Sequence, residues 1–190
     1  MTRQTLLQAS LGASSITRQA LIVLGGSALV ALGAQVSVPM LPVPMTLQTL
    51  AILLVGFTAG ARLGAAALVA YLVEGAMGLP VFAGGHAGAA WLMGPTAGFL
   101  FGFVAMAWAA GFLAERGIAR GFVGTVLSAL AVTALLYVPG VAWLNAATPL
   151  DLSGAINAGM VPFLLGDAVK AVVAALVVTG AWSALRSRRG

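Results

Sequence analysis

Residues 19–61 read QALIVLGGSALVALGAQVSVPMLPVPMTLQTLAILLVGFTAGA, and none of them carries a charged side chain. A transmembrane helix needs about 20 apolar residues, so this stretch is too long for a single span. Three prolines divide it: Pro39, Pro42 and Pro44. Because proline interrupts the hydrogen bonds of a helix, the stretch predicts two helices, at about 18–38 and 46–59, joined by a proline-rich connection.

The composition of the chain agrees with a membrane location. Hydrophobic residues make up 61% of its 190 positions and charged residues only 7%. A soluble domain carries roughly 25% charged residues, because water must solvate its surface. We therefore expect an integral protein of the inner (plasma) membrane, in contact with the lipid bilayer and without a cleavable signal peptide. The net charge of +5 comes from arginines in loops and at the ends, so no nucleic-acid partner is predicted.

The remaining apolar segments predict four more spans, at about 62–79, 95–114, 121–143 and 158–184. Together the six spans form one membrane domain over residues 1–190, and its fold class is an all-α bundle of about six helices. In this arrangement the arginines all fall in the two ends and in the loops of one side: Arg3, Arg18, Arg62, Arg116, Arg120, Arg186, Arg188 and Arg189. The positive-inside rule places these segments in the cytoplasm, so both termini are expected to be cytoplasmic.

Two charged residues, Asp167 and Lys170, fall within the predicted last span, a third to halfway along it from the outer end. Residues three apart lie on one face of a helix, so the two side chains are within reach of each other. They either neutralise each other and only fix helix packing, or form a solute site in which the carboxylate accepts N–H donors and the ammonium binds an anion. The second interpretation is favoured, because intramembrane charges more often mark a solute path.

Other polar residues near the predicted outer side have several possible roles. Glu74, in the outer half of the third span, can balance Lys170, bind the solute or reach the membrane interface. Gln48 and Asn157 are expected to open the second and sixth helices, where they either cap the helix or face an outer cavity. His86, the only histidine, lies in a glycine-rich loop and is expected to be structural, so no metal site is predicted.

Aromatic residues gather on the same predicted outer side. Tyr137 and Trp143 are expected to be interfacial anchors, which is the usual role of tyrosine and tryptophan in membrane proteins. Phe82 and Trp91 belong to the glycine-rich loop between the third and fourth spans. This loop is therefore a candidate wall for an outward-facing pocket.

The sequence lacks the residues that common forms of catalysis need. It has no cysteine, and its single lysine, Lys170, follows Val169 and so belongs to no Gly-Lys-Ser/Thr phosphate-binding loop. Asp167 is the only spanning aspartate, which excludes a paired-aspartate site. Ser153 has neither a base nor oxyanion donors beside it in the sequence. The chain is therefore predicted not to be an enzyme.

Four motifs resemble those of the BioY family, the biotin-binding S components of energy-coupling factor (ECF) transporters. In order, they are 43–50 (VPMTLQTL), 78–85 (GLPVFAGG), 92–98 (LMGPTAG) and 166–170 (GDAVK). The resemblance extends from about residue 18 to the C-terminus. It implies six packed helices, an extracellular pocket, and a lid formed by the proline-rich connection, with Pro39, Pro42, Pro44 and Met45.

The resemblance also implies how biotin is held. Asp167 and Lys170 become the leading ligands, and which polar end of biotin meets Lys170 stays open. The loop around Phe82 supplies close backbone and apolar contacts. The candidates for the rest of the site are Phe82, Gly84, Gly85, Trp91, Tyr71, Glu74, Gln48 and Asn157.

No cofactor is implied, because biotin is the transported ligand. The implied partners are a coupling transmembrane subunit and two ABC-type ATPases, since the chain cannot supply energy itself. S components meet the coupling subunit through an Ala-x-x-x-Ala pattern, and the first helix here has only looser stripes: Ser27 with Ala31, and Ala28 with Ala31 and Ala34. Three other functions fit the same residues, namely capture of another vitamin, proton-coupled carriage through Asp167 and Glu74, and a purely structural scaffold.

Overall fold

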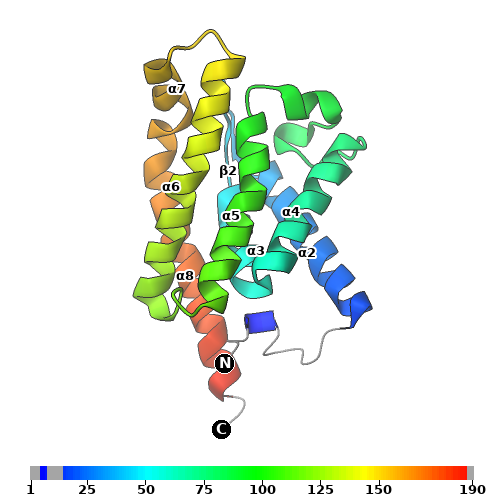
Figure 1. The fold of residues 1–190 in the computed structure, drawn as a ribbon, viewed down its shortest axis with the longest axis vertical. Helices are drawn as coiled ribbons and strands as arrows, with labels where there is room; N and C mark the ends of the chain where they lie inside the picture. The colour runs from blue at the N-terminus through cyan, green and yellow to red at the C-terminus, as the bar shows by residue number, and fades with distance from the viewer. Residues whose placement is uncertain (1–4, 8–14, 188–190) are drawn as a thin grey trace.

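The computed structural model describes residues 5–7 and 15–187, and the described chain forms a bundle of helices that alternate in direction (Figure 1). The main helices are α2 (Ile16–Gln35), α3 (Gln48–Ala59), α4 (Ala61–Ala76), α5 (Ala97–Glu115), α6 (Gly121–Ala147) and α8 (Leu164–Ser187). The helices α2 and α6 begin at one end of the bundle, which we call the arginine end because it holds Arg18, Arg62, Arg116 and Arg120. The opposite end is called the hairpin end.

Among the described residues, four helical stretches are long and apolar enough to cross a membrane. They are Ile16–Gln35, Ala97–Glu115, Gly121–Ala147 and the stretch Leu152–Leu185. The helix α3 is apolar but has only 12 residues, and α4 has 16. The helical membrane protein predicted from the sequence is thus confirmed, whereas α3 and α4, two of its predicted spans, are shorter than an isolated transmembrane helix.

The short helix α3 lies inside the bundle, against α5 and α8 (Figure 1). Most of its residues are buried, among them Ile52, Leu53 and Phe57. A Cβ atom added at Gly56 would lie only 2.7 Å from the carbonyl oxygen of Ala107 on α5. Such close contact of backbones is typical of helix packing in membranes, where small residues allow it. Neighbouring helices therefore shield α3 from lipid, which explains why a short helix is tolerated there.

The predicted last span, 158–184, is wrong at its beginning. The chain first forms the short helix α7 (Leu152–Gly159), then a single 3₁₀ turn at Val161–Phe163, and only then α8. Pro162 lies in that turn, and a proline cannot donate the hydrogen bond that would continue α7. Asp167 consequently lies in the first turn of α8.

Two irregular segments form the hairpin end. The first is the hairpin segment 37–46, in which β1 (Ser37–Val38) and β2 (Met45–Thr46) pair antiparallel, so the structure is not purely α-helical. The second is the connection 77–96 between α4 and α5, which contains two 3₁₀ turns. The hairpin contains the predicted proline lid, and both segments contribute side chains to the cavity described next.

Candidate functional site

A cavity lies at the hairpin end, between the two irregular segments and the helices. Its empty volume is about 640 Å³, a value that includes the solvent-open space at its mouth. The side chains that line it are Val43, Pro44, Thr46, Gln48, Thr49, Ala83, Trp91, Thr96, Phe99, Leu100, Phe103, Leu136, Tyr137, Gly159, Phe163, Asp167 and Lys170. Besides Trp91, seven of these seventeen residues have polar or charged side chains and the others are apolar, so the cavity suits a solute that combines apolar and polar parts.

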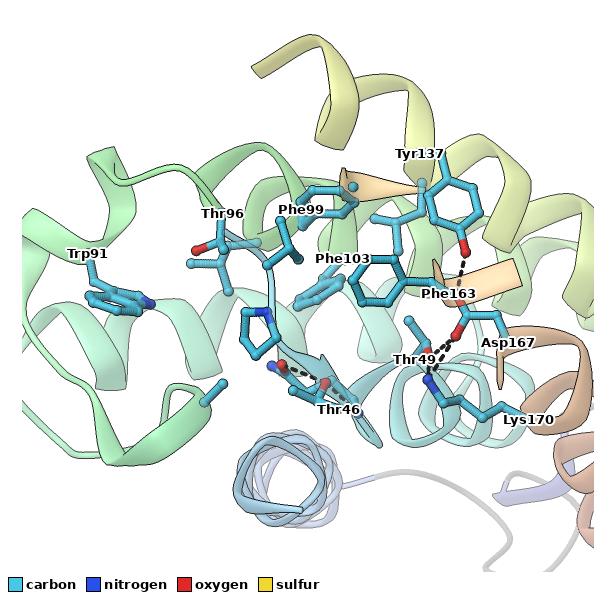
Figure 2. Close-up of a pocket in the computed structure, with 17 residues that line it drawn as sticks. Thr46, Thr49, Trp91, Thr96, Phe99, Phe103, Tyr137, Phe163, Asp167 and Lys170 are labelled. Atoms are coloured by element: carbon cyan, nitrogen blue, oxygen red, sulfur yellow. Dashed lines mark hydrogen bonds and ion pairs between the residues drawn. The ribbon is translucent and has the colours of Figure 1, made fainter. Parts of the chain in front are cut away.

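One end of the cavity holds a charged network that joins three helices (Figure 2). The Oδ1 atom of Asp167 accepts hydrogen bonds from Lys170 Nζ and from the Thr49 hydroxyl, both at 2.8 Å. The Tyr137 hydroxyl donates to Oδ2 at 2.6 Å, and Lys170 Nζ also donates to Thr49 Oγ1 at 3.1 Å. Asp167 and Lys170 are only 5% and 8% exposed. The ion pair is therefore shielded from bulk water and each of its oxygens is satisfied.

Local structure explains why this network forms at the start of α8. Asp167 lies in the first turn, where the positive end of the helix dipole stabilises a carboxylate. Lys170 follows one turn later on the same face, so the two charges meet. Thr49 on α3 and Tyr137 on α6 approach from 118 and 30 residues away in the sequence. Only the tertiary fold can bring these hydroxyls to the pair.

The network keeps unused hydrogen-bonding capacity that points to a ligand. An ammonium group has three N–H donors, and in the described part of the chain Lys170 uses them on two acceptors, Asp167 and Thr49. One donor is thus left over, in a wall of the cavity. The Tyr137 hydroxyl donates to Asp167, and its oxygen can still accept a hydrogen bond. This end of the cavity can bind a group that offers both a hydrogen-bond acceptor and N–H or O–H donors.

Aromatic side chains form the body of the cavity. Phe99, Phe103 and Phe163 lie between the charged network and the far end, where Figure 2 shows Trp91 and Thr96. The Trp91 ring stacks on His86 with 4.0 Å between ring centroids. The cavity is therefore elongated, with a charged end, an apolar aromatic middle, and a far end walled by the connection 77–96.

Of the residues predicted to bind solute, four belong to the cavity wall: Asp167, Lys170, Gln48 and Trp91. The lid contributes Pro44, whereas Pro39, Pro42 and Met45 lie outside the wall. On β2, Thr46 lines the cavity and Met45 does not, because neighbouring side chains of a strand point to opposite faces. Ligand contact by the four wall residues stays a prediction.

The loop around Phe82 is arranged differently from the prediction. Phe82 is fully buried and packs edge-on against Tyr71, with 5.6 Å between ring centroids, so neither ring lines the cavity. A Cβ atom at Gly75 would lie 2.1 Å from the Phe82 ring, so only glycine leaves room for it. Gly84 and Gly85 are exposed. From this loop, Ala83 is the residue that reaches the cavity wall.

Two further predicted contacts lie away from the cavity. Glu74 accepts a short hydrogen bond from the Ser27 hydroxyl at the interface of α4 with α2, so it does not balance Lys170. Asn157 does not open the sixth helix, because α8 begins after the break at Pro162, and its side chain is exposed on α7. Both residues are therefore removed from the candidate site.

Sequence reasoning missed the hydroxyls and the phenylalanines of the wall. Tyr137 was expected to be an interfacial anchor, which is wrong: it is 7% exposed and donates to Asp167. Thr49 directly follows Gln48 in the motif 43–50, so the motif gave a weak indication that Thr49 belongs to the site. Phe99, Phe103 and Phe163 carry no such signal, because apolar side chains in a membrane helix are as common on lipid-facing sides as on cavity-facing sides.

An apolar helical bundle with a charged, aromatic cavity near one end defines a class: an integral membrane protein that binds a small solute. The comparison with known families narrows this class. Residues 2–187 match the BioY family, and the chain belongs to it. It is accordingly an integral protein of the cell membrane and a transport protein rather than an enzyme.

Individual relatives agree with this membership. The chain is 42% identical to the "Biotin transporter BioY" of Thermotoga maritima over 151 residues, which cover 80% of this chain and 88% of the relative. It is 39% identical to the "Biotin transporter BioY" of Rhizobium etli over 158 residues, 78% and 84% of the two chains. The crystal structure of an S-component for biotin from an ECF-type ABC transporter superposes with a TM-score of 0.79. That alignment covers 94% of this chain and 96% of the other at 23% identity, a likeness that establishes the fold.

Proposed function

We propose that this chain captures biotin at the outer face of the membrane, as the substrate-binding S component of an ECF-type vitamin transporter. The observation that carries the proposal is the buried network of Asp167, Lys170, Thr49 and Tyr137 at one end of an aromatic cavity. Biotin combines a ureido group, which offers both N–H donors and an oxygen acceptor, with an apolar ring and chain. These features match the unused hydrogen-bonding capacity of the network and the apolar middle of the cavity.

The orientation in the membrane is part of the proposal. Six spans, namely α2, α3, α4, α5, α6 and α8, with the arginine end in the cytoplasm, satisfy the positive-inside rule. The cavity then opens on the extracytoplasmic side, where the hairpin segment 37–46 covers it as a lid. A charged cavity near that side suits capture of a dilute solute from outside the cell.

The partners proposed are a coupling membrane subunit and two ABC-type ATPases. The chain has no Gly-Lys-Ser/Thr sequence with which to bind ATP through a phosphate-binding loop, so the energy has to come from other chains. Of the loose small-residue stripes on α2, Ser27 and Ala34 are buried in the bundle, while Ala28 is exposed. Any docking through small residues of α2 therefore involves the face with Ala28 rather than the one with Ser27.

Binding of labelled biotin to the detergent-purified protein tests the proposal. Wild type is expected to bind one biotin tightly, and Asp167→Asn is expected to lose binding because its amide cannot replace a carboxylate beside Lys170. Asp151→Asn is the matched control, because Asp151 only caps α7 from an exposed position outside the cavity. If folded wild-type protein does not bind biotin but binds thiamine or riboflavin, the proposed solute is wrong and another vitamin takes its place. Biotin uptake that needs no ATPase and follows the proton gradient would replace the S component with a carrier.

A further inference from the structure

A chain of three hydrogen bonds crosses the hairpin end beside the cavity. The Thr46 hydroxyl donates to Gln48 Oε1 at 3.0 Å, Gln48 Nε2 donates to the Tyr71 hydroxyl at 2.9 Å, and that hydroxyl donates to the Val81 carbonyl at 3.1 Å. Gln48 is 4% exposed and Tyr71 is fully buried. Unlike the charged network, this series of three hydrogen bonds contains no ionised group.

The direction of these bonds is set at the Val81 end. A carbonyl oxygen can only accept, so the Tyr71 O–H must donate to Val81. The Tyr71 oxygen then accepts from Gln48, which requires the nitrogen of the Gln48 amide to point toward it. The oxygen of the same amide is left facing Thr46, whose hydroxyl donates to it. Tyr71 thus decides which way the Gln48 amide lies.

This orientation matters because Gln48 lines the cavity whereas Tyr71 does not. An amide NH₂ group has two donors, and one of them is used on Tyr71. In the described residues the second donor has no acceptor, so it is available to a solute. If the amide rotated, it would present its oxygen instead, and a solute acceptor would meet another acceptor.

The same chain connects the two irregular segments that wall the cavity. Thr46 belongs to the hairpin segment 37–46, and Val81 belongs to the connection 77–96. Each segment also supplies other wall residues, including Pro44 from the first and Trp91 from the second. Gln48 and Tyr71 lie between the segments on α3 and α4, so the hydrogen-bonded path between them is complete only when both side chains are present.

We propose that Tyr71 is a positioning residue for solute capture: its hydroxyl orients the Gln48 amide and joins the hairpin segment 37–46 to the connection 77–96, without touching the solute. The identity of the solute rests on the proposed function. The joining of the two segments does not, because every donor and acceptor in this series of hydrogen bonds belongs to the protein. Gln35 also donates to the Phe82 carbonyl at 3.2 Å, so loss of the Tyr71 hydroxyl loosens the connection without releasing it.

A double-mutant cycle on biotin binding tests the orienting role. Tyr71→Phe is expected to weaken binding about tenfold, mainly through faster dissociation, because one buried hydrogen bond is lost. Gln48→Leu is expected to weaken it at least as much. In the Gln48→Leu background, Tyr71→Phe should have no further effect, since the chain is already broken. Independent, additive losses in the double variant would overturn the proposal, because they would show that Tyr71 acts only on general stability.

Hydrogen–deuterium exchange of the ligand-free protein tests the joining of the segments without any assumption about biotin. In Tyr71→Phe, amides of both 37–46 and 77–96 are expected to exchange faster, while those of α5 and α6 keep their rates. Thr58→Val is the matched control, because its hydroxyl on α3 donates only within its own helix, to the Leu54 and Val55 carbonyls. Faster exchange in only one of the two segments, or equal changes in the control, would contradict the proposal. Failure of wild type to bind biotin would overturn the proposed function alone.

Discussion

Asp167 and Glu74 are both carboxylates on helices of the bundle, yet the bundle surrounds them very differently. Asp167 lies in the cavity wall, where a lysine and two hydroxyls from three helices donate to it. Glu74 is half-buried at the contact of α4 with α2, and the Ser27 hydroxyl donates to it. One acid lines a cavity, and the other joins two helices.

This difference shows that a carboxylate inside a helical bundle can be stabilised in two ways. A carboxylate paired with an ammonium beside a cavity can exchange part of its hydrogen bonding with a solute, because both groups already face the space that the solute fills. A carboxylate held between helices stabilises their packing and has no such access. The residue type alone does not distinguish the two cases, so variants of both acids are the sharpest test of the comparison.

The largest effect on biotin binding is expected when the charge pair is broken. A second variant then replaces both charged residues by uncharged ones. Lys170→Met leaves Asp167 buried without its cation, which costs about 3–5 kcal/mol in comparable buried pairs. Biotin affinity measured by equilibrium binding should fall by more than about a hundredfold. The double variant Asp167→Asn with Lys170→Met should regain thermal stability but not binding. Recovery of binding in the double variant would show that the pair is only a packing device.

An intermediate effect is expected from the two hydroxyls that support Asp167. Tyr137→Phe and Thr49→Val each remove a hydrogen bond to a charged group, worth about 1.5–3 kcal/mol. Each should weaken biotin binding by about ten- to a hundredfold in the same assay, and the pair should be less than additive because both act on one carboxylate. Thr58→Val, which removes a hydroxyl from α3 outside the cavity, should bind like wild type. A normal affinity in both Tyr137→Phe and Thr49→Val would limit the site to the ion pair.

A smaller effect, on stability alone, is expected for the acid between helices. Glu74→Gln weakens the contact with Ser27 and should lower stability by about 1 kcal/mol, measured as a lower thermal midpoint in detergent. Biotin affinity should stay within about threefold of wild type, which corresponds to a change of less than about 1 kcal/mol in the free energy of binding. Ser27→Ala should cause a similar loss, and combining the two changes should add little. A large loss of affinity in Glu74→Gln would return Glu74 to the binding site.

The smallest effect is expected for an acid outside the spans. Asp151 caps α7, with its Oδ1 accepting from the backbone N–H of Gly154 at 2.8 Å. Asparagine caps helices about as well as aspartate, so Asp151→Asn should change the thermal midpoint by less than the error of the assay. Asp151→Ala should cost about 1 kcal/mol, with unchanged biotin affinity. A strong loss of binding in Asp151→Asn would indicate that the charge itself attracts or excludes the solute.

The helices of the bundle were largely predictable because each is formed by one continuous apolar stretch of the sequence. The absence of charge over 19–61 and the prolines within it predict α2, α3 and the connection between them, and the structure confirms these elements within a few residues. The break before α8 was missed, because Pro162 lies in an apolar run that hydropathy alone reads as uninterrupted. The β1–β2 hairpin was missed because its ladder pairs only two residues on each strand.

The site was predictable where its residues are neighbours in sequence. Asp167 and Lys170 are three apart, and helical geometry alone places them on one face. Thr49 and Tyr137 come from distant helices, so nothing local in the sequence assigns them to Asp167. Tyr71 shows the opposite error, since it was predicted to touch the solute but lies behind Gln48. A resemblance of short motifs indicates the neighbourhood of a site, not which side chains face the cavity.

The sequence by itself determined that this protein is a membrane protein and that one of its helices carries a charge pair. It also determined approximately where the helices begin and end. These properties depend on composition and on spacing within single helices, which lipid and helical geometry constrain directly. Only the tertiary structure decided which acid lines the cavity and which accepts a hydrogen bond from a serine. That choice depends on how each helix is rotated about its axis, and this rotation is set by close packing between helices that are distant in sequence.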